Sequence, residues 1–234
     1  MHIGVGLIAV FALSAVHLFA NQAKVLGWVW HGRFLSFASG LSFAYVFIDL
    51  LPALAKGQPV LKMAFGELIP YFDRHTYLIA LIGVLFFYGI HAVSQGKKKE
   101  RFWLTLIGYM LFNFFVGASL SDSANPDIQP VVLFTFAIAM HYFVRDHNTK
   151  ENSAPLFEHQ GRWGLVLALL AGYITGRLSH IPDAIVALLI SFLAGGIFLN
   201  VLRYELPKNE KEGYVCFATG ALLYTAILIF VGQG

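Results

Sequence analysis

The sequence predicts an all-α membrane protein with eight transmembrane helices arranged as a 3+2+3 inverted repeat. Three observations lead to this fold class: apolar segments of bilayer-spanning length, an alternation of basic and less basic loops, and an internal repeat. Of the 234 residues, 58% are hydrophobic and 12% are charged, whereas soluble domains carry about 25% charged residues. Most of the chain is therefore expected to contact lipid or other apolar helices.

The apolar segments define the expected spans, because a helix needs about 20 apolar residues to cross a bilayer. By this measure one transmembrane domain covers residues 1–234. Its spans are expected at about 2–20, 33–54, 76–95, 102–121, 128–145, 163–180, 183–204 and 213–232. The second span is expected to end near Pro52, because proline disrupts helices. The connection 56–75 is expected to be either a short amphipathic interfacial helix or a plain loop.

The Lys and Arg residues predict the orientation of the spans, because cytoplasmic loops carry an excess of these residues. With the N-terminus outside, twelve of the sixteen Lys and Arg residues fall in inside loops and four in outside loops. This alternation predicts a multi-pass protein of a cell or inner membrane, with both termini outside. Nucleic acid is not expected as a partner, because the basic residues are few and flank apolar segments.

Two of the spans share a sequence pattern at a constant offset of 155 residues. Segments 36–52 and 191–207 are identical at seven positions, which form the pattern SFxxGxxFxxVxxxxLP. In the predicted topology the first segment runs outward and the second inward, so the repeat is inverted. Inverted repeats are typical of transporters, with substrate sites near the membrane midplane. The alternative is an old duplication that now only packs a helical bundle.

The two related spans resemble those of the ZIP family of divalent metal transporters. Segment 47–52 (FIDLLP) is similar to the His-Leu-Leu-Pro-Glu type motif that ends the family's second helix, and segment 194–207 runs from Ala-Gly to Glu-Leu-Pro as in the seventh. The resemblance extends over essentially the whole chain. It implies eight spans, both ends outside, a 3+2+3 inverted arrangement, and homodimers in the lipid bilayer. It also implies that a divalent metal such as zinc, or another small solute, moves across the membrane as the central helices rock or slide.

The resemblance places the metal chemistry of this family on spans four and five. Segment 112–117 (FNFFVG) stands where the family has His-Asn-x-x-Asp-Gly, and it keeps Asn113 and Gly117. Segment 141–146 (HYFVRD) stands where the family has His-Glu-x-Pro-His-Glu, and it keeps His141 and an acidic final residue. The other family ligands are replaced by residues that do not bind metal.

These matches imply a metal site made of His141, Asn113 and Asp146, with Asp49 receiving cations at the outer mouth of the pathway. A transition-metal site needs several His, carboxylate or thiolate groups that converge on one point. Arg145 lies one helical turn from His141, and its positive charge opposes a divalent cation. Asp146 can therefore either bind metal or neutralise Arg145. Asp49 can equally be a paired carboxylate at the membrane interface.

Other polar groups inside the spans are candidates because they are costly in a bilayer. His17 is expected to form interhelical hydrogen bonds rather than to bind metal, and Glu205 is expected to pair with Arg203. The chain contains no H-E-x-x-H, G-x-S-x-G or P-loop motif, so an enzyme is not expected. The alternatives to transport are a non-transporting binding or regulatory protein on the same fold and, less favoured, an intramembrane enzyme.

Overall fold

The computed structural model describes residues 3–19, 28–67, 73–93, 98–121, 128–179, 182–206 and 211–231. All elements within these residues are helical, which confirms the all-α prediction for this part of the chain. The α-helices are α1 (Ile3–Phe19), α2 (Trp28–Tyr45), α3 (Leu51–Phe65), α4 (His75–Val93), α5 (Lys98–Leu120), α6 (Ile128–Leu156), α7 (Arg162–Leu178), α8 (Asp183–Asn200) and α9 (Lys211–Val231). Three π-helical turns are η2 (Val46–Leu50), η3 (Phe157–Gly161) and η4 (Val201–Glu205).

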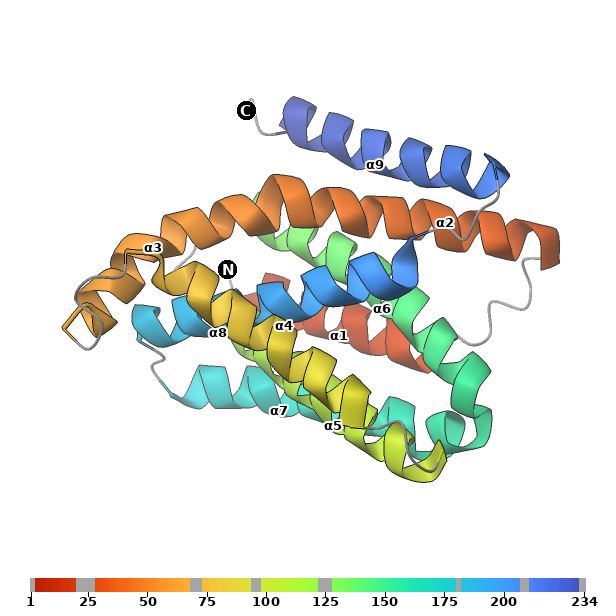
Figure 1. The fold of residues 1–234 in the computed structure, drawn as a ribbon, viewed down its shortest axis with the longest axis horizontal. Helices are drawn as coiled ribbons and strands as arrows, with labels where there is room; N and C mark the ends of the chain where they lie inside the picture. Colours follow the sequence, from red (N-terminus) through yellow and green to blue (C-terminus); the bar gives the residue numbers. More distant parts are fainter. Residues whose placement is uncertain are drawn as a thin grey trace.

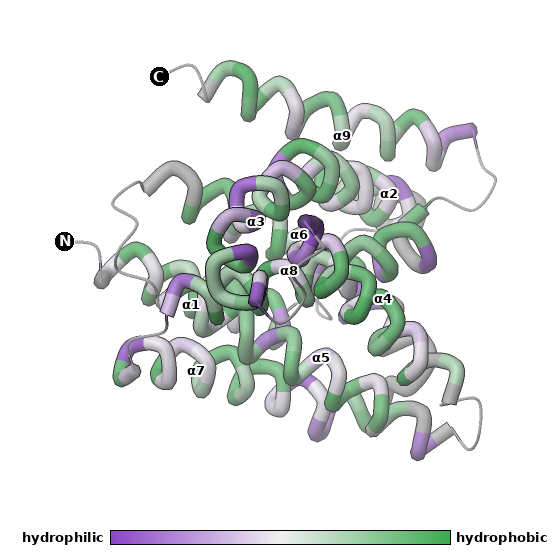
Figure 2. Tube along the Cα trace, turned by 60° about the vertical axis from the view of Figure 1, so that its left-hand side comes forward, coloured by the Kyte–Doolittle hydropathy of each residue, from purple (hydrophilic) through white to green (hydrophobic). Residues whose placement is uncertain are grey.

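Within the described residues, four helices are long and apolar enough to cross a membrane. They are Gly32–Phe65, Phe102–Leu120, Asp183–Arg203 and Lys211–Phe230, and two shorter apolar helices are Gly4–Phe19 and His75–Ile90. In Figure 2 most of the helical trace is coloured as hydrophobic or intermediate, and hydrophilic residues occur in a few places. Large apolar side chains such as Phe11, Leu222 and Phe230 are exposed, as expected for surfaces that face lipid. These features are those of a membrane protein.

The second helix continues past the point where the sequence predicted its end. Helices α2, η2 and α3 follow one another without a break, so the helix runs through Pro52 to Phe65. A proline lacks the backbone N–H and clashes with the carbonyl four residues earlier in a regular α-helix. The wider π-turn η2 lies directly before Pro52 and relieves that clash. Segment 56–75 therefore begins as a continuation of this helix and not as a separate interfacial helix.

We group the helices into two sets of packed neighbours, called the first and the second body. In the first body α5 packs along α7, and α1 packs against α5, α6 and α7. In the second body α2 packs along α9, α4 packs along α8, and α3 contacts both α4 and α8. Figure 1 shows α9 beside the long α2–α3 helix at one side of the molecule and α7 beside α5 at the other. The bodies meet where α6 contacts α2 and where α5 contacts α4 and α8.

Two helix crossings of the second body are built on paired glycines. Where α2 crosses α9, Gly40 faces the backbone carbonyl of Phe217, and Gly220 faces that of Phe37. A Cβ atom at either glycine would overlap the facing oxygen. The helices can therefore approach this closely only because both positions lack a side chain.

The crossing of α4 and α8 has the same construction. Gly195 of α8 faces the backbone carbonyl of Ala80, and Gly83 of α4 faces that of Phe192. Residues 37 and 40 of the first crossing correspond to residues 192 and 195 of the second at the offset of 155. Residues 37 and 40 are three positions apart, and so are residues 192 and 195. The two members of each pair therefore lie on one face of their helix.

The start of α4 is anchored to α3 by one side chain. The Gln58 carbonyl oxygen accepts hydrogen bonds from the backbone N–H of Thr76, at 3.1 Å, and from its hydroxyl, at 2.8 Å. The Gln58 amide donates to the backbone carbonyl of Asp73 at 2.5 Å. The nearby Lys62 ammonium contacts Asp73 at 2.6 Å, and its hydrogen bond and charge hold the pKa of that exposed carboxyl below its usual value.

Gln58→Ala is expected to destabilise the protein by roughly 1 to 2 kcal/mol, because buried Thr76 loses the acceptor for its first-turn N–H and its hydroxyl. Thermal unfolding of the purified protein in detergent measures this loss. Lys62→Ala is the control, and it is expected to change stability by less than about 1 kcal/mol because its ion pair is exposed. Equal losses in both variants would contradict an anchoring role for Gln58.

Candidate functional site

A cluster of polar side chains is buried inside the first body. His17 comes from α1, Asn113 from the middle of α5, and Arg145 and Asp146 from α6. The side chains of His17, Asn113 and Asp146 are fully buried, and that of Arg145 is 5% exposed. His17 connects the three helices: its Nδ1 lies 2.6 Å from Asp146 Oδ2 and its Nε2 lies 2.7 Å from Asn113 Oδ1. His17 is thus an interhelical hydrogen-bonding residue, as its position in the sequence predicted.

The hydrogen bonds of the cluster determine where its protons lie. The Asn113 amide nitrogen donates to the backbone carbonyl of Tyr109 at 2.8 Å, which leaves the amide oxygen as the atom that faces His17. His17 Nε2 must therefore carry a hydrogen. The short contact from Nδ1 to Asp146 requires a second proton between nitrogen and oxygen. The imidazole of His17 is thus hydrogen-bonded at both ring nitrogens, to Asn113 and to Asp146.

Arg145 forms an ion pair with the same carboxylate. Its Nη2 donates to Asp146 Oδ1 at 3.0 Å. Its guanidinium carbon lies 4.4 Å from the centre of the Tyr109 ring and 4.9 Å from that of Tyr142. Tyr142 also packs on the ring of His17, with 4.4 Å between the ring centres. The two aromatic faces stabilise a guanidinium that is almost completely removed from water.

The charges of the cluster oppose the binding of a divalent cation. Arg145 places a permanent positive charge inside the cluster, and the one carboxylate, Asp146, is already paired with it. The oxygen atoms of Asn113 and Asp146 that were predicted as metal ligands already accept hydrogen bonds. Among the described residues there is no group of three or more His, Cys, Asp or Glu side chains that could hold a metal ion. The metal site of His141, Asn113 and Asp146 stays a prediction.

The structure brings together some of the predicted site residues and separates others. Asn113 and Asp146 meet around His17, as described above. His141 is buried one turn before Arg145, and its ring lies 5.8 Å from that of Phe112. Asp49 belongs to the second body, where it accepts a hydrogen bond from the Tyr224 hydroxyl at 2.8 Å. The structure does not describe the side chain of Glu205. The predicted pairing of Glu205 with Arg203 therefore lies outside the described residues.

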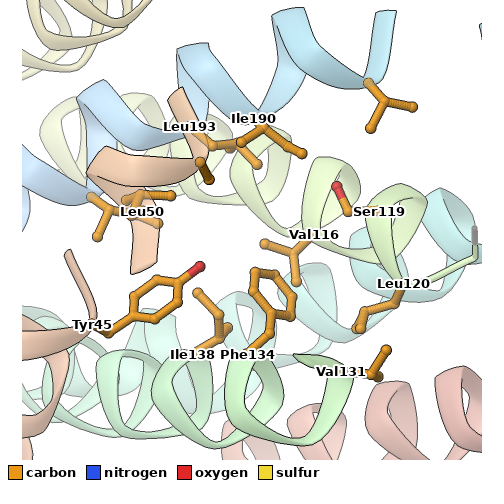
Figure 3. Close-up of a pocket in the computed structure, with 13 residues that line it drawn as sticks. Tyr45, Leu50, Val116, Ser119, Leu120, Val131, Phe134, Ile138, Ile190 and Leu193 are labelled. Carbon is orange, nitrogen blue, oxygen red and sulfur yellow. The ribbon is translucent and has the colours of Figure 1, made fainter. Parts of the chain in front are cut away.

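A pocket of about 270 Å³, here called the large pocket, lies between the two bodies. Figure 3 shows side chains that face it from both bodies. The lining residues are Tyr45, Leu50, Ala53, Val116, Ser119, Leu120, Val131, Phe134, Ile138, Val186, Ile190, Leu193 and Ile197. Val116 lies one turn beyond Asn113, and Ile138 lies one turn before His141. The large pocket is therefore adjacent to the buried cluster.

A second pocket, here called the small pocket, lies further along the contact between the bodies. Its volume is about 20 Å³, and it is lined by residues of α4, α5, α8 and η4 that include Thr105, Tyr109 and Asn200. A volume of this size holds about one water molecule. The large pocket meets the C-terminal half of α5 and the small pocket its N-terminal half. Of these two pockets, the larger thus lies toward one end of the contact between the bodies and the smaller toward the other.

Tyr45 is the residue of the large pocket that sequence reasoning missed. It lies in the repeated segment and corresponds to Asn200 of the small pocket at the offset of 155. Neither residue belongs to the seven identities, and both side chains are buried. A search of the repeat for polar residues at equivalent positions, and not only for identical ones, could have identified this pair.

Comparison with known proteins identified no relative, because no protein-family model and no curated protein matches the chain. The function is therefore inferred from the two bodies, the pockets and the buried cluster.

Proposed function

We propose that the protein is a ZIP-like integral membrane transporter that carries a small solute by alternating access. In this proposal the chain has eight spans with both termini outside, and the two bodies move relative to each other. The observation that carries the proposal is the pair of pockets along one contact, one of about 270 Å³ and the other of about 20 Å³. A transporter caught open to one side and closed to the other has this asymmetry.

The lining of the pockets supports the predicted orientation of the spans. Of the thirteen lining residues of the large pocket, eleven belong to the predicted outer halves of their spans, and Ile138 and Ile197 lie just beyond the midpoints of theirs. Residues 87–90, 105–109 and 199–203 of the small pocket all belong to predicted inner halves. A missing or additional span among the helices involved would mix outer and inner segments in one pocket. The large pocket is accordingly the outward-facing one.

Backbone features support the inverted repeat. The π-turns η2 and η4, at Val46–Leu50 and Val201–Glu205, are separated by the same 155 residues as the sequence pattern. The glycine crossings at Gly40 and Gly195 are also separated by 155 residues, and each joins a repeated helix to a helix of the other repeat. In the proposed topology α2 and α9 are spans two and eight, and α8 and α4 are spans seven and three. The contact of spans two and eight therefore corresponds to the contact of spans seven and three. An inverted repeat requires this exchange of partners.

Of the two kinds of cargo that the sequence predicts, a divalent metal ion and another small solute, the lining of the large pocket favours an uncharged small solute. None of the thirteen side chains around the large pocket is charged, and an ion loses its hydration there without compensation. The buried cluster next to this pocket holds the guanidinium of Arg145, whose charge opposes a cation that passes the pocket. A pathway for metal would have to avoid both places.

Alternating access is tested by the reactivity of single cysteines in a Cys216→Ser background. Ala53→Cys lies in the large pocket and Thr105→Cys in the small pocket. We expect an impermeant thiol reagent added outside to label Ala53→Cys. We expect Thr105→Cys to remain unlabelled when the reagent is added inside. Exposed Lys62→Cys and buried Leu13→Cys are the positive and negative controls. Labelling of Thr105→Cys from outside would contradict the proposed topology.

Transport is tested in proteoliposomes with glycerol and 1,2-cyclohexanediol as uncharged solutes and with zinc, manganese and iron(II) ions. We expect uptake of at least one uncharged solute and loss of that uptake in Ala53→Phe, whose ring fills the large pocket. Ala55→Phe is the matched control, because Ala55 lies outside the pocket lining and is exposed. Uptake of the ions alone would show a metal transporter. No uptake of any of them would favour a non-transporting binding protein.

A further inference from the structure

We propose that the large pocket binds a small uncharged molecule through a hydrogen bond from the Tyr45 hydroxyl to an acceptor oxygen of that molecule. The inference rests on the proposed function only in taking this pocket as the solute site. Binding itself does not require transport, so the two proposals can fail separately.

The side chain of Tyr45 is buried, and its hydroxyl borders the large pocket with no hydrogen bond to another described residue. The Tyr45 side chain is 6% exposed, and Figure 3 shows its oxygen directed into the space between the lining residues. Buried hydroxyl groups in proteins almost always have a partner, because an unpaired one loses its interaction with water. In this pocket a bound molecule, or water in its absence, has to supply the acceptor.

Neighbouring aromatic rings fix the direction of the Tyr45 hydroxyl. The rings of Phe134 and Tyr224 pack edge-to-face against Tyr45, with ring centres 6.2 Å and 6.4 Å away. Tyr224 is itself held by its hydrogen bond to Asp49. The hydroxyl is thus held in place before a ligand arrives, which favours specific binding.

The remaining lining limits the ligand to a compact, mostly apolar molecule. The other hydroxyl of the pocket, Ser119, donates to the backbone carbonyl of Phe115 at 3.0 Å, so Tyr45 is the donor that remains for a ligand. The lining contains no charge to compensate a charged ligand. A cavity of about 150 Å³ can hold benzene, so about 270 Å³ has room for a ring with substituents.

The experiment compares three probes of nearly equal shape: cyclohexanone, methylenecyclohexane and cyclohexanecarboxylate. Cyclohexanone has the acceptor oxygen, methylenecyclohexane has a carbon in its place, and the carboxylate is charged. Binding to the full chain in lipid nanodiscs is measured by ligand-observed NMR titration, with empty nanodiscs subtracted to remove partitioning into lipid. We expect cyclohexanone to bind about fivefold more tightly than methylenecyclohexane, the value of one net hydrogen bond, and the carboxylate not to bind.

Two variants locate the binding and identify the donor. Tyr45→Phe is expected to abolish the preference for cyclohexanone while leaving the affinity for methylenecyclohexane unchanged. Ala53→Phe is expected to abolish binding of both probes, and Ala55→Phe to leave it intact. The proposal is overturned if the preference survives in Tyr45→Phe, if the carboxylate binds best, or if no probe binds above the empty nanodiscs. Binding with these properties but without alternating cysteine reactivity would retain the ligand site and refute the transport mechanism.

Discussion

Asp146→Ala is expected to cost about 3 to 5 kcal/mol of stability, the effect of removing one partner from a buried ion pair. The substitution leaves the guanidinium of Arg145 and the imidazole of His17 without the carboxylate that they share. It also breaks the link between α1 and α6. A thermal unfolding midpoint lower by roughly 10 °C in detergent, or failure of the protein to accumulate, is the expected measurement.

Removal of the whole cluster distinguishes an uncompensated charge from a lost contact. The triple variant His17→Leu, Arg145→Leu, Asp146→Leu replaces every charge by an apolar group of moderate size. Buried ion clusters replaced in this way often lose little stability, so the triple variant is expected to be more stable than Asp146→Ala. Asp73→Ala, at an exposed ion pair, is the control and is expected to change stability by less than about 1 kcal/mol. A triple variant that is less stable than the single one would show that the cluster stabilises the fold by more than charge balance.

The helical class of the fold was predictable because it depends on properties that act over many residues. Apolar segments of bilayer length and the distribution of Lys and Arg are averages, so single exceptions do not disturb them. The end of the second helix was not predictable from such averages. It depends on one local feature, the π-turn before Pro52, which a proline at this position does not require.

The candidate site was predicted only in part, for a related reason. Asn113 and Asp146 were predicted as ligands of a metal site, which stays a prediction, and in the structure both hydrogen-bond to His17. Their partner was not predictable, because the group they share is His17, more than 90 residues before Asn113 in the chain. Sequence spacing within one or two helices carries no information on which third helix completes a cluster.

Gly195→Ala is expected to destabilise the protein by about 3 kcal/mol, the upper end of the range for overpacked cores. The added methyl group would overlap the backbone carbonyl oxygen of Ala80 on α4. A side chain could rotate away from such a contact, but backbone of a packed helix cannot. Helices α4 and α8 would have to move apart along their whole contact, which also changes the walls of the large pocket on α8.

Gly40→Ala provides the corresponding test on the other repeat, where the methyl group would overlap the carbonyl oxygen of Phe217 on α9. Gly89→Ala is the control, because no atom lies within 4 Å of the added methyl group, and alanine there is expected to be neutral or stabilising by about 0.5 to 1 kcal/mol. If the two crossings are equivalent parts of an inverted repeat, Gly40→Ala and Gly195→Ala should lower the unfolding midpoint by similar amounts. A large loss at one position and none at the other would instead indicate that the shared glycine is a remnant of duplication without a shared structural role.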